Sequence, residues 1–143
     1  MKKSLILLLS ALVIAVAFVS CGSDSDDKPK DPVVTVVKPA AVTEVAATGG
    51  TIDVEFTITN RTIASCSFDV KFAEQAGGGV KVITEIDVPK KTISGTDGTY
   101  NAQITVQPNA RAGKYKLTVY YKVEGEESER THSHEFTVNV PSN

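Results

Sequence analysis

Several residue types that build common functional sites are scarce in this chain. Its 143 residues include no tryptophan, one methionine, two cysteines and two histidines, and only 6% are aromatic. Sugar-binding faces usually offer exposed aromatic rings, so few positions could serve such a face. The chain also lacks a basic excess, because its formal net charge is −2. Since nucleic acid requires a basic surface, this charge argues against DNA or RNA as a partner.

The motifs of several enzyme classes are also missing. No G-x-S-x-G segment is present to place a serine nucleophile. The glycine-rich segment 77–81 lacks the pattern of a phosphate loop and is typical of a flexible hairpin turn. The neighbouring carboxylates Glu126 and Glu127 fall in a predicted exposed turn, where a solvated side chain is unsuited to acid catalysis. The sequence therefore predicts a protein that is not an enzyme.

The first twenty residues have the pattern of a secretory signal peptide. Lys2 and Lys3 give a positive start, a predominantly apolar stretch follows over 5–19, and the small residue Ser20 comes next. The apolar stretch is about fifteen residues long, which is short of the roughly 20 that a membrane-spanning helix needs. Residues 1–20 are therefore expected to be removed.

The cysteine that follows this segment resembles the lipobox cysteine of bacterial lipoproteins. The resemblance implies cleavage between Ser20 and Cys21, with lipid attached to the Cys21 thiol. Several acyl chains would hold the protein at a membrane without a spanning helix. A lipidated Cys21 would leave Cys66 as a lone thiol, so no internal disulfide could form. The covalent lipid is the only cofactor that the resemblance implies.

Residues 21–32 are expected to form a lipidated, disordered tether. After Cys21 this segment has only small, charged and proline residues, which cannot bury enough apolar surface to offset the entropy cost of ordering. Extended, it reaches at most about 36 Å. Its acidic cluster, Asp24, Asp26 and Asp27, resembles a signal that exports some lipoproteins to the cell surface. The resemblance implies a surface-exposed lipoprotein of the outer membrane, and the alternative is a solvated spacer.

From residue 33 to residue 143 the dominant period is two, which is typical of β-strands that bury one face. No stretch repeats apolar residues at helical spacing for long enough to form a helix. The pattern predicts an all-β fold of seven strands in a two-sheet sandwich, because each apolar sheet face needs a second sheet to cover it. The expected strands are Val33–Val37, Ile52–Ile58, Cys66–Phe72, Val80–Val88, Tyr100–Val106, Tyr115–Val123 and Phe136–Val140.

One local motif refines this fold. The segment 109–115, which ends at Tyr115, resembles the tyrosine corner of immunoglobulin-like domains. The resemblance implies that the Tyr115 hydroxyl bonds to the backbone upstream, and that residues 33–143 form a seven-stranded immunoglobulin-like β-sandwich. Leu117 stands where antibody domains have a cysteine, so the resemblance is to the broad fold. Small lipoproteins of this design occur in bacterial envelopes, many of them in families of unknown function.

Cys66 shares the parity of Phe68, Val70 and Phe72, so its side chain should point into the core. A buried thiol in apolar surroundings has a raised pKa and is unreactive. We therefore expect Cys66 to be a buried free thiol with a structural role.

The two histidines, His132 and His134, are two residues apart on one predicted strand, so both imidazoles could reach one ion. A zinc or copper site needs three or four ligands, and neither cysteine nor methionine stands beside the pair. We expect no metal here. A metal-binding protein or an enzyme centred on this pair is the more remote alternative.

Tyr120 is the one aromatic residue after the signal whose parity points outward. Lys116, Thr118 and Lys122 share its face and form with it a small basic and aromatic strip. Such a strip could contact a ligand, and an exposed ring suits a glycan. The alternative is a cross-strand pair that stabilises the sheet.

These patterns lead to one main functional hypothesis. The protein is expected to be a non-catalytic, lipid-anchored surface protein that presents an immunoglobulin-like interaction or structural module at the bacterial outer membrane. It would meet the membrane through its lipid and bind an unidentified protein or glycan. The first alternative is a glycan-binding accessory lipoprotein of a surface uptake system, and the second is the histidine-centred protein described above.

Overall fold

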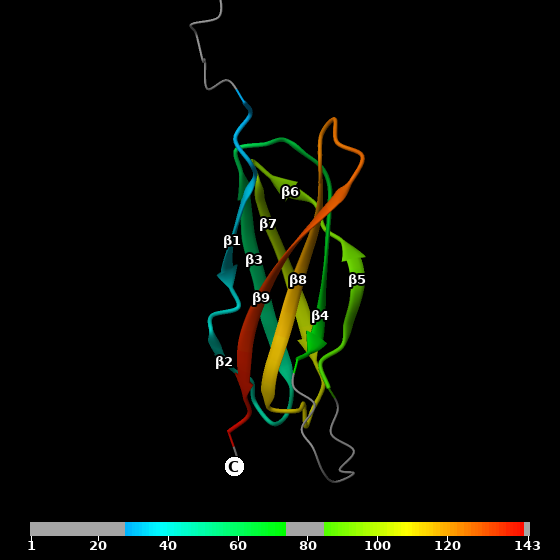
Figure 1. Cartoon of the computed structure of the whole chain (residues 1–143). Coiled ribbons are helices and arrows are strands. Elements are labelled where there is room, and N and C mark those ends of the chain that lie inside the picture. The colour runs from blue at the N-terminus through cyan, green and yellow to red at the C-terminus, as the bar shows by residue number, and fades with distance from the viewer. Residues whose placement is uncertain (1–27, 74–84, 142–143) are drawn as a thin grey trace, which may run out of the picture.

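The computed structural model describes residues 28–73 and 85–141, and every regular element within them is a β-strand. Figure 1 shows these strands as two sheets that form an elongated sandwich. The described ranges hold no helix, and therefore none that is long and apolar enough to cross a membrane. The strands are β1 (Val33–Lys38), β2 (Val42–Glu44), β3 (Gly50–Thr59), β4 (Ile63–Phe72), β5 (Val88–Thr92), β6 (Gly95–Thr96), β7 (Thr99–Val106), β8 (Gly113–Val123) and β9 (Glu129–Asn139).

The two sheets differ in strand number and order. One has the order β1-β3-β7-β6 and the other has the order β2-β9-β8-β4-β5. Neighbouring strands are antiparallel except for β2, which pairs parallel to β9. The chain therefore changes sheets between β1 and β2, where the peptide bond between Lys38 and Pro39 is cis.

The core lies between the sheets and is built from the inward row of each strand. On β3 the buried and outward positions alternate, and on β8 every second residue from Tyr115 to Val123 is buried. Each large apolar side chain that is fully buried contributes about 1.5–3 kcal/mol before conformational entropy is subtracted. The largest fully buried side chains are Tyr115, Phe56, Phe68, Phe136 and Leu117.

The prediction of an all-β, two-sheet fold is confirmed, but the prediction of seven strands is wrong, because the described residues form nine. Strands β2 and β6 have three and two residues, which is too short for an alternating pattern to be visible. Strand β9 also begins well before the expected residue 136, because its first half is polar and carries little apolar signal.

The expected strand over Val80–Val88 is also wrong in its described part. Residues 80–84 lie outside the described ranges, residues 85–87 belong to no strand, and the strand begins only at Val88. The side chain of Ile86 is buried, which fits the alternation that predicts a strand here. Its backbone N–H, however, donates to the Tyr115 side-chain hydroxyl at 3.4 Å and not to the backbone of a neighbouring strand. Strand β5 lies at the sheet edge and is mostly exposed, so it has no inward row.

The two ends of the sandwich carry different turns and different ends of the described chain. The chain enters β1 at the end that also carries the β3–β4 and β8–β9 turns, as Figure 1 shows. We call this end the leash pole and define it by residues 28–32, 60–62 and 124–128. The opposite end, the far pole, carries the β2–β3 turn at 45–49 and lies near the end of β9.

Candidate functional site

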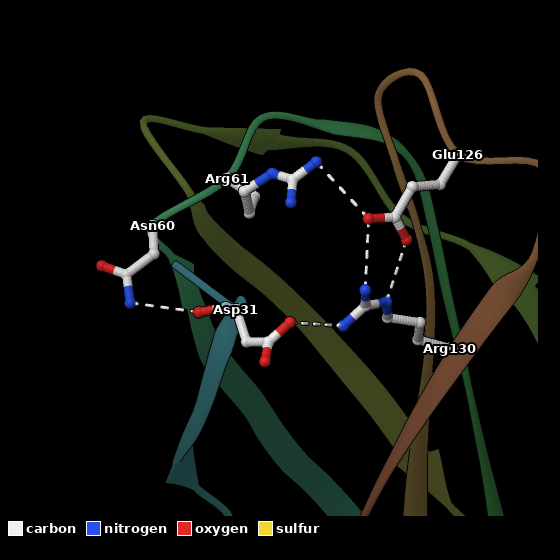
Figure 2. A network of polar contacts seen from close by, with 5 residues as sticks. All are labelled: Asp31, Asn60, Arg61, Glu126 and Arg130. Carbon is white, nitrogen blue, oxygen red and sulfur yellow. Dashed lines mark hydrogen bonds and ion pairs between the residues drawn. The ribbon is translucent and has the colours of Figure 1, made fainter. Parts of the chain in front are cut away.

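A network of polar side chains joins the entering chain to the turns of the leash pole (Figure 2). Asp31 lies two residues before β1, and its main-chain carbonyl accepts a hydrogen bond of 3.2 Å from the Asn60 side-chain amide. Asn60 occupies the left-handed backbone region at φ 72°, which asparagine tolerates better than most residues. The β3–β4 turn is thereby bonded to the segment that precedes β1.

The second half of the network reaches the β8–β9 turn. The Arg130 guanidinium donates two hydrogen bonds to the Glu126 carboxylate, at 3.0 and 3.1 Å, and a third to the Asp31 carboxylate at 3.3 Å. Arg61 forms an ion pair with the same Glu126 at 3.4 Å. The hydrogen bonds that Arg130 donates to the carboxylates of Glu126, first, and of Asp31 raise the pKa of Arg130. We call these five residues, Asp31, Asn60, Arg61, Glu126 and Arg130, the leash clamp.

The leash clamp joins an exposed residue, Asp31, to a partly buried group of charged side chains. Asp31 is exposed, with 87% of its side chain accessible, so its ion pair with Arg130 contributes little to the free energy of unfolding. The side chains of Arg61, Glu126 and Arg130 are partly buried, at 20%, 25% and 34% accessible. What they do is connect the chain before β1 to two turns from distant parts of the sequence. The direction in which the chain leaves the sandwich is therefore held by several contacts at once.

Sequence reasoning did not identify this network. The sequence pattern predicts a solvated loop at Glu126, but the structure places the Glu126 carboxylate between two guanidinium groups. The only local signal was the spacing of four residues between Glu126 and Arg130. The partners Asp31 and Arg61 are brought close only by the folded chain, so no pattern along the sequence indicates them.

Tyr120 lies on the outer side of β8 and is half-buried, which corrects the prediction of an exposed aromatic contact. The Lys90 ammonium, from edge strand β5, lies 4.1 Å from the centre of the Tyr120 ring. The same ammonium is 2.6 Å from a Glu129 carboxylate oxygen. The face of the ring is therefore occupied by a cation from the same chain. Its expected companions differ in exposure: Lys116 is exposed, Lys122 is half-buried and Thr118 is buried.

The Tyr120 hydroxyl donates a 2.8 Å hydrogen bond to Asp69, and this bond is the first cause of the raised pKa of Tyr120. Asp69 is only 9% exposed, and its other carboxylate oxygen has no hydrogen-bond partner within the described residues. It lies where the β4–β5 register shifts, opposite a segment that contains Pro89, which has no N–H to donate. The nearby Lys71 is already paired with Asp87.

The two histidines lie on β9 as half-buried side chains. The His134 ring nitrogen Nε2 lies 3.2 Å from the main-chain oxygen of Pro39, so this imidazole contacts the link between β1 and β2. Within residues 28–73 and 85–141, no group of three or more His, Cys, Asp or Glu side chains is placed to hold a metal ion. The arrangement gives the pair of His132 and His134 no further ligand from the described residues.

Two predicted structural residues lie inside the sandwich. The Tyr115 hydroxyl donates a 2.7 Å hydrogen bond to the Arg111 carbonyl, four residues upstream, and burial raises the pKa of Tyr115. Cys66 is a free cysteine with 4% of its surface exposed, and burial raises its pKa to about 12. Neither side chain is placed to react with a substrate. Cys21, the expected lipid attachment site, lies outside the described residues.

Comparison with known proteins adds little. No family model and no curated protein matches the chain. An engineered protein of known structure has 19% identity and a TM-score of 0.48, with 78% of this chain and 21% of that chain covered. A chain from a study of T cell activation by the bacterial superantigen toxic shock syndrome toxin-1 has 13% identity and a TM-score of 0.46, with coverages of 78% and 100%.

A third similar structure is a family 123 glycoside hydrolase from Clostridium perfringens, with 12% identity and a TM-score of 0.41. The match covers 78% of this chain and 28% of the hydrolase. This chain thus spans about a fifth of the engineered protein, at 21%, and under a third of the hydrolase. Similarities of this size carry no argument about function.

Proposed function

We propose that this protein is a non-catalytic, lipid-anchored module of the bacterial envelope. Residues 1–20 would be its signal peptide, Cys21 its lipid attachment site and residues 21–32 its tether at the outer membrane, with the sandwich facing the cell surface. The order of features in the N-terminal sequence supports this: positive residues, an apolar segment, a cysteine and then a polar segment.

The observation in the folded part that carries the proposal is the leash clamp. An anchored module benefits from a defined junction between tether and body. Asp31 is bonded to Asn60 of the β3–β4 turn and to Arg130 at the start of β9, which in turn holds Glu126 of the β8–β9 turn. The far pole thereby lies at the end of the sandwich opposite the junction, and the outer faces of both sheets run between the two poles. A partner would approach these surfaces, as is usual for sandwich domains that bind through loops or edges.

We also propose that the sandwich is of the immunoglobulin-like type. The sheet β1-β3-β7-β6 has the order of strands A, B, E and D in that fold, and β4, β8 and β9 follow the order of C, F and G. Strands β2 and β5 are then additions at the two edges of the second sheet. The hydrogen bond from Tyr115 to the Arg111 carbonyl has the form of a tyrosine corner, which further supports this assignment.

The alternatives have less support. A glycan platform at Tyr120 would require Lys90 to leave the ring that it covers. A metal centre at His132 would require ligands beyond His134, which instead lies against the Pro39 carbonyl. We therefore keep the anchored interaction module as the proposed function.

Mass spectrometry of the protein extracted from membranes tests the proposal. We expect residues 1–20 to be absent and Cys21 to carry diacylglycerol on its sulfur and an acyl chain on its amine. Cys21→Ser should move the protein from the membrane fraction to the soluble fraction. An unmodified Cys21 in a protein that fractionates as soluble would contradict the proposal. Protease added to intact cells then tests whether the sandwich is exposed at the surface.

A further inference from the structure

We propose that β1 is a self-association edge, where a second copy of this chain adds its own β1 antiparallel to the first. The strand is the last in its sheet, so one side of its backbone pairs with β3 and no described segment pairs with the other. Unpaired backbone groups along a sheet edge form a ready template for another strand. The pairing would join two four-stranded sheets into one continuous sheet.

The side chains of this edge are also unusual for a surface. Among the described residues, the exposed large apolar side chains are three valines: Val33, Val37 and Val42, with 50%, 49% and 57% of their surfaces accessible. Val33 and Val37 belong to β1, and Val42 belongs to β2. Figure 1 shows β1 and β2 following one another along the same side of the sandwich. The exposed apolar surface is thus concentrated at one edge.

The other edges of the two sheets lack these properties. Strand β5 contains Pro89 followed by Lys90 and Lys91, and both proline and lysine oppose the addition of a strand. Strands β6 and β2 have two and three residues, so they offer little backbone to a partner. Only β1 combines length, an open backbone and exposed apolar side chains in the described part of the chain.

The outward row of β1 fits a second copy of itself. The row reads Val33, Thr35, Val37, so an antiparallel pair centred on Thr35 places each Val33 opposite Val37 of the other copy. The residues beyond the row are oppositely charged, with Asp31 before it and Lys38 after it. The antiparallel arrangement brings the Asp31 end of each copy beside the Lys38 end of the other. Both charges are paired within their own chain, Asp31 with Arg130 and Lys38 with Asp53 and Glu55, so the fit to a second copy rests on the matching row of side chains.

The β-bulge in this strand sets the length of the pairing. The register with β3 shifts between Val36 and Lys38, so Val37 is the extra residue and the regular ladder ends there. Five residues, Val33–Val37, remain for a partner, which is close to the usual length of a strand. The contact should therefore be weak in solution. It is strengthened where anchoring confines two copies to one membrane plane and raises their effective concentration.

Cysteine cross-linking of the full chain in a bacterial envelope tests the pairing and its register. Residues directly opposite in an antiparallel pair have Cα atoms about 4.5–5.5 Å apart, which is within the range of a disulfide bond. Thr35→Cys should therefore give a covalent dimer after mild oxidation. Val33→Cys should link to Val37→Cys when the two variants are expressed together, and neither should link efficiently to itself.

Thr51→Cys is the matched control, because Thr51 is an exposed threonine on the outer side of β3 in the same sheet. It should give no dimer. Adding Val37→Lys to Thr35→Cys should abolish the dimer band without lowering the melting temperature, since Val37 is half exposed. Equal dimer from Thr35→Cys and Thr51→Cys would overturn the proposal, and efficient self-linking of Val33→Cys would overturn the antiparallel register.

Oxidation of the wild-type protein distinguishes a failure of the edge pairing from a failure of the proposed lipid attachment. Cys66 is buried, so a disulfide dimer of the wild type would indicate a free Cys21 thiol and would contradict the proposed anchor. The edge pairing would then be judged from Thr35→Cys in a Cys21→Ser background. Dimer formation there would support the pairing without the lipid, and its absence at high protein concentration would overturn it.

Discussion

At the scale of single residues, the most unusual polar group is the Asp69 carboxylate. It is buried on the outward side of its sheet, and one of its two oxygens has no hydrogen-bond partner within the described ranges. The other oxygen accepts the Tyr120 hydroxyl. Because a buried acceptor without a donor is costly, this single bond should matter more than an ordinary surface contact.

We expect Tyr120→Phe to lower the free energy of unfolding by about 1–3 kcal/mol. Without the Tyr120 hydroxyl, neither oxygen of the Asp69 carboxylate would have a hydrogen-bond donor among the described residues. Urea unfolding of the wild type and the variant measures the change. In an Asp69→Ala background the same substitution should have a much smaller effect, since the acceptor is gone. An equal loss in both backgrounds would show that the ring, and not the hydrogen bond, is responsible.

Parity along the sequence gives the side of the sheet on which Tyr120 lies, but not what else lies there. The ring is covered by Lys90, which belongs to a strand that the sequence pattern placed several residues too early. A cation that approaches from a neighbouring edge strand leaves no periodic signal. The parity of Tyr120 therefore predicts on which face of the sheet the candidate ligand surface lies. That Lys90 covers the ring depends on tertiary packing, which the sequence pattern does not show.

At the scale of elements, strands with a strictly alternating apolar row were predictable, and short or edge strands were not. Strands β3 and β8 bury every second side chain, and β7 does so except at the partly buried Ala102, so a period of two marks them clearly. Strand β6 has only two residues, and its pairing with β7 is set by the tight turn at Asp97 and Gly98 that joins the two strands. Asp97 and Gly98 both have positive φ, at 51° and 75°, as in the tight turns that favour Asp-Gly.

Gly98→Ala should lower the free energy of unfolding by about 1–3 kcal/mol. The backbone there has a left-handed φ, and a Cβ would lie 2.6 Å from the Ile58 carbonyl oxygen of β3. The Ile58 N–H also donates to the Gly98 carbonyl at 2.8 Å, so the turn has little freedom to move away. Thermal or urea unfolding measures the loss.

Gly50→Ala is the control for this substitution. Gly50 begins β3, has an ordinary φ, and a Cβ there would meet nothing within 4 Å. Its replacement should change the free energy of unfolding by less than about 0.5 kcal/mol. If both alanine variants were equally stable, the close approach of the β6–β7 turn to β3 would be wrong.

At the scale of the whole molecule, the sequence predicts the proposed tether but not the contacts that join it to the sandwich. The composition of residues 21–32 indicates a tether, because polar and acidic residues cannot form a core. The leash clamp that receives it joins Asp31 to Arg130, which are 99 residues apart. Such a contact depends on the sheet topology, so no local pattern could indicate it.

If the proposed anchor is present, the leash pole should face the membrane and the far pole should face away. The tether enters at the leash pole and reaches at most about 36 Å, and the clamp fixes its last residues to the body. The long strands β8 and β9 run between the poles, and eleven residues of strand span roughly 36 Å. Labels at the two poles should therefore differ strongly in their distance from the lipid head groups.

Fluorophores attached to cysteines that replace Glu127 and Thr48 measure this difference. Both residues are exposed, one at the leash pole and one at the far pole, whereas Cys66 is too buried to react. In vesicles that contain nitroxide-labelled head groups, the label at position 127 should be quenched more strongly than the label at position 48. Neither should be quenched in a Cys21→Ser background. Equal quenching of both positions in the anchored protein would mean that the sandwich lies flat or tumbles freely, and that the clamp does not orient it.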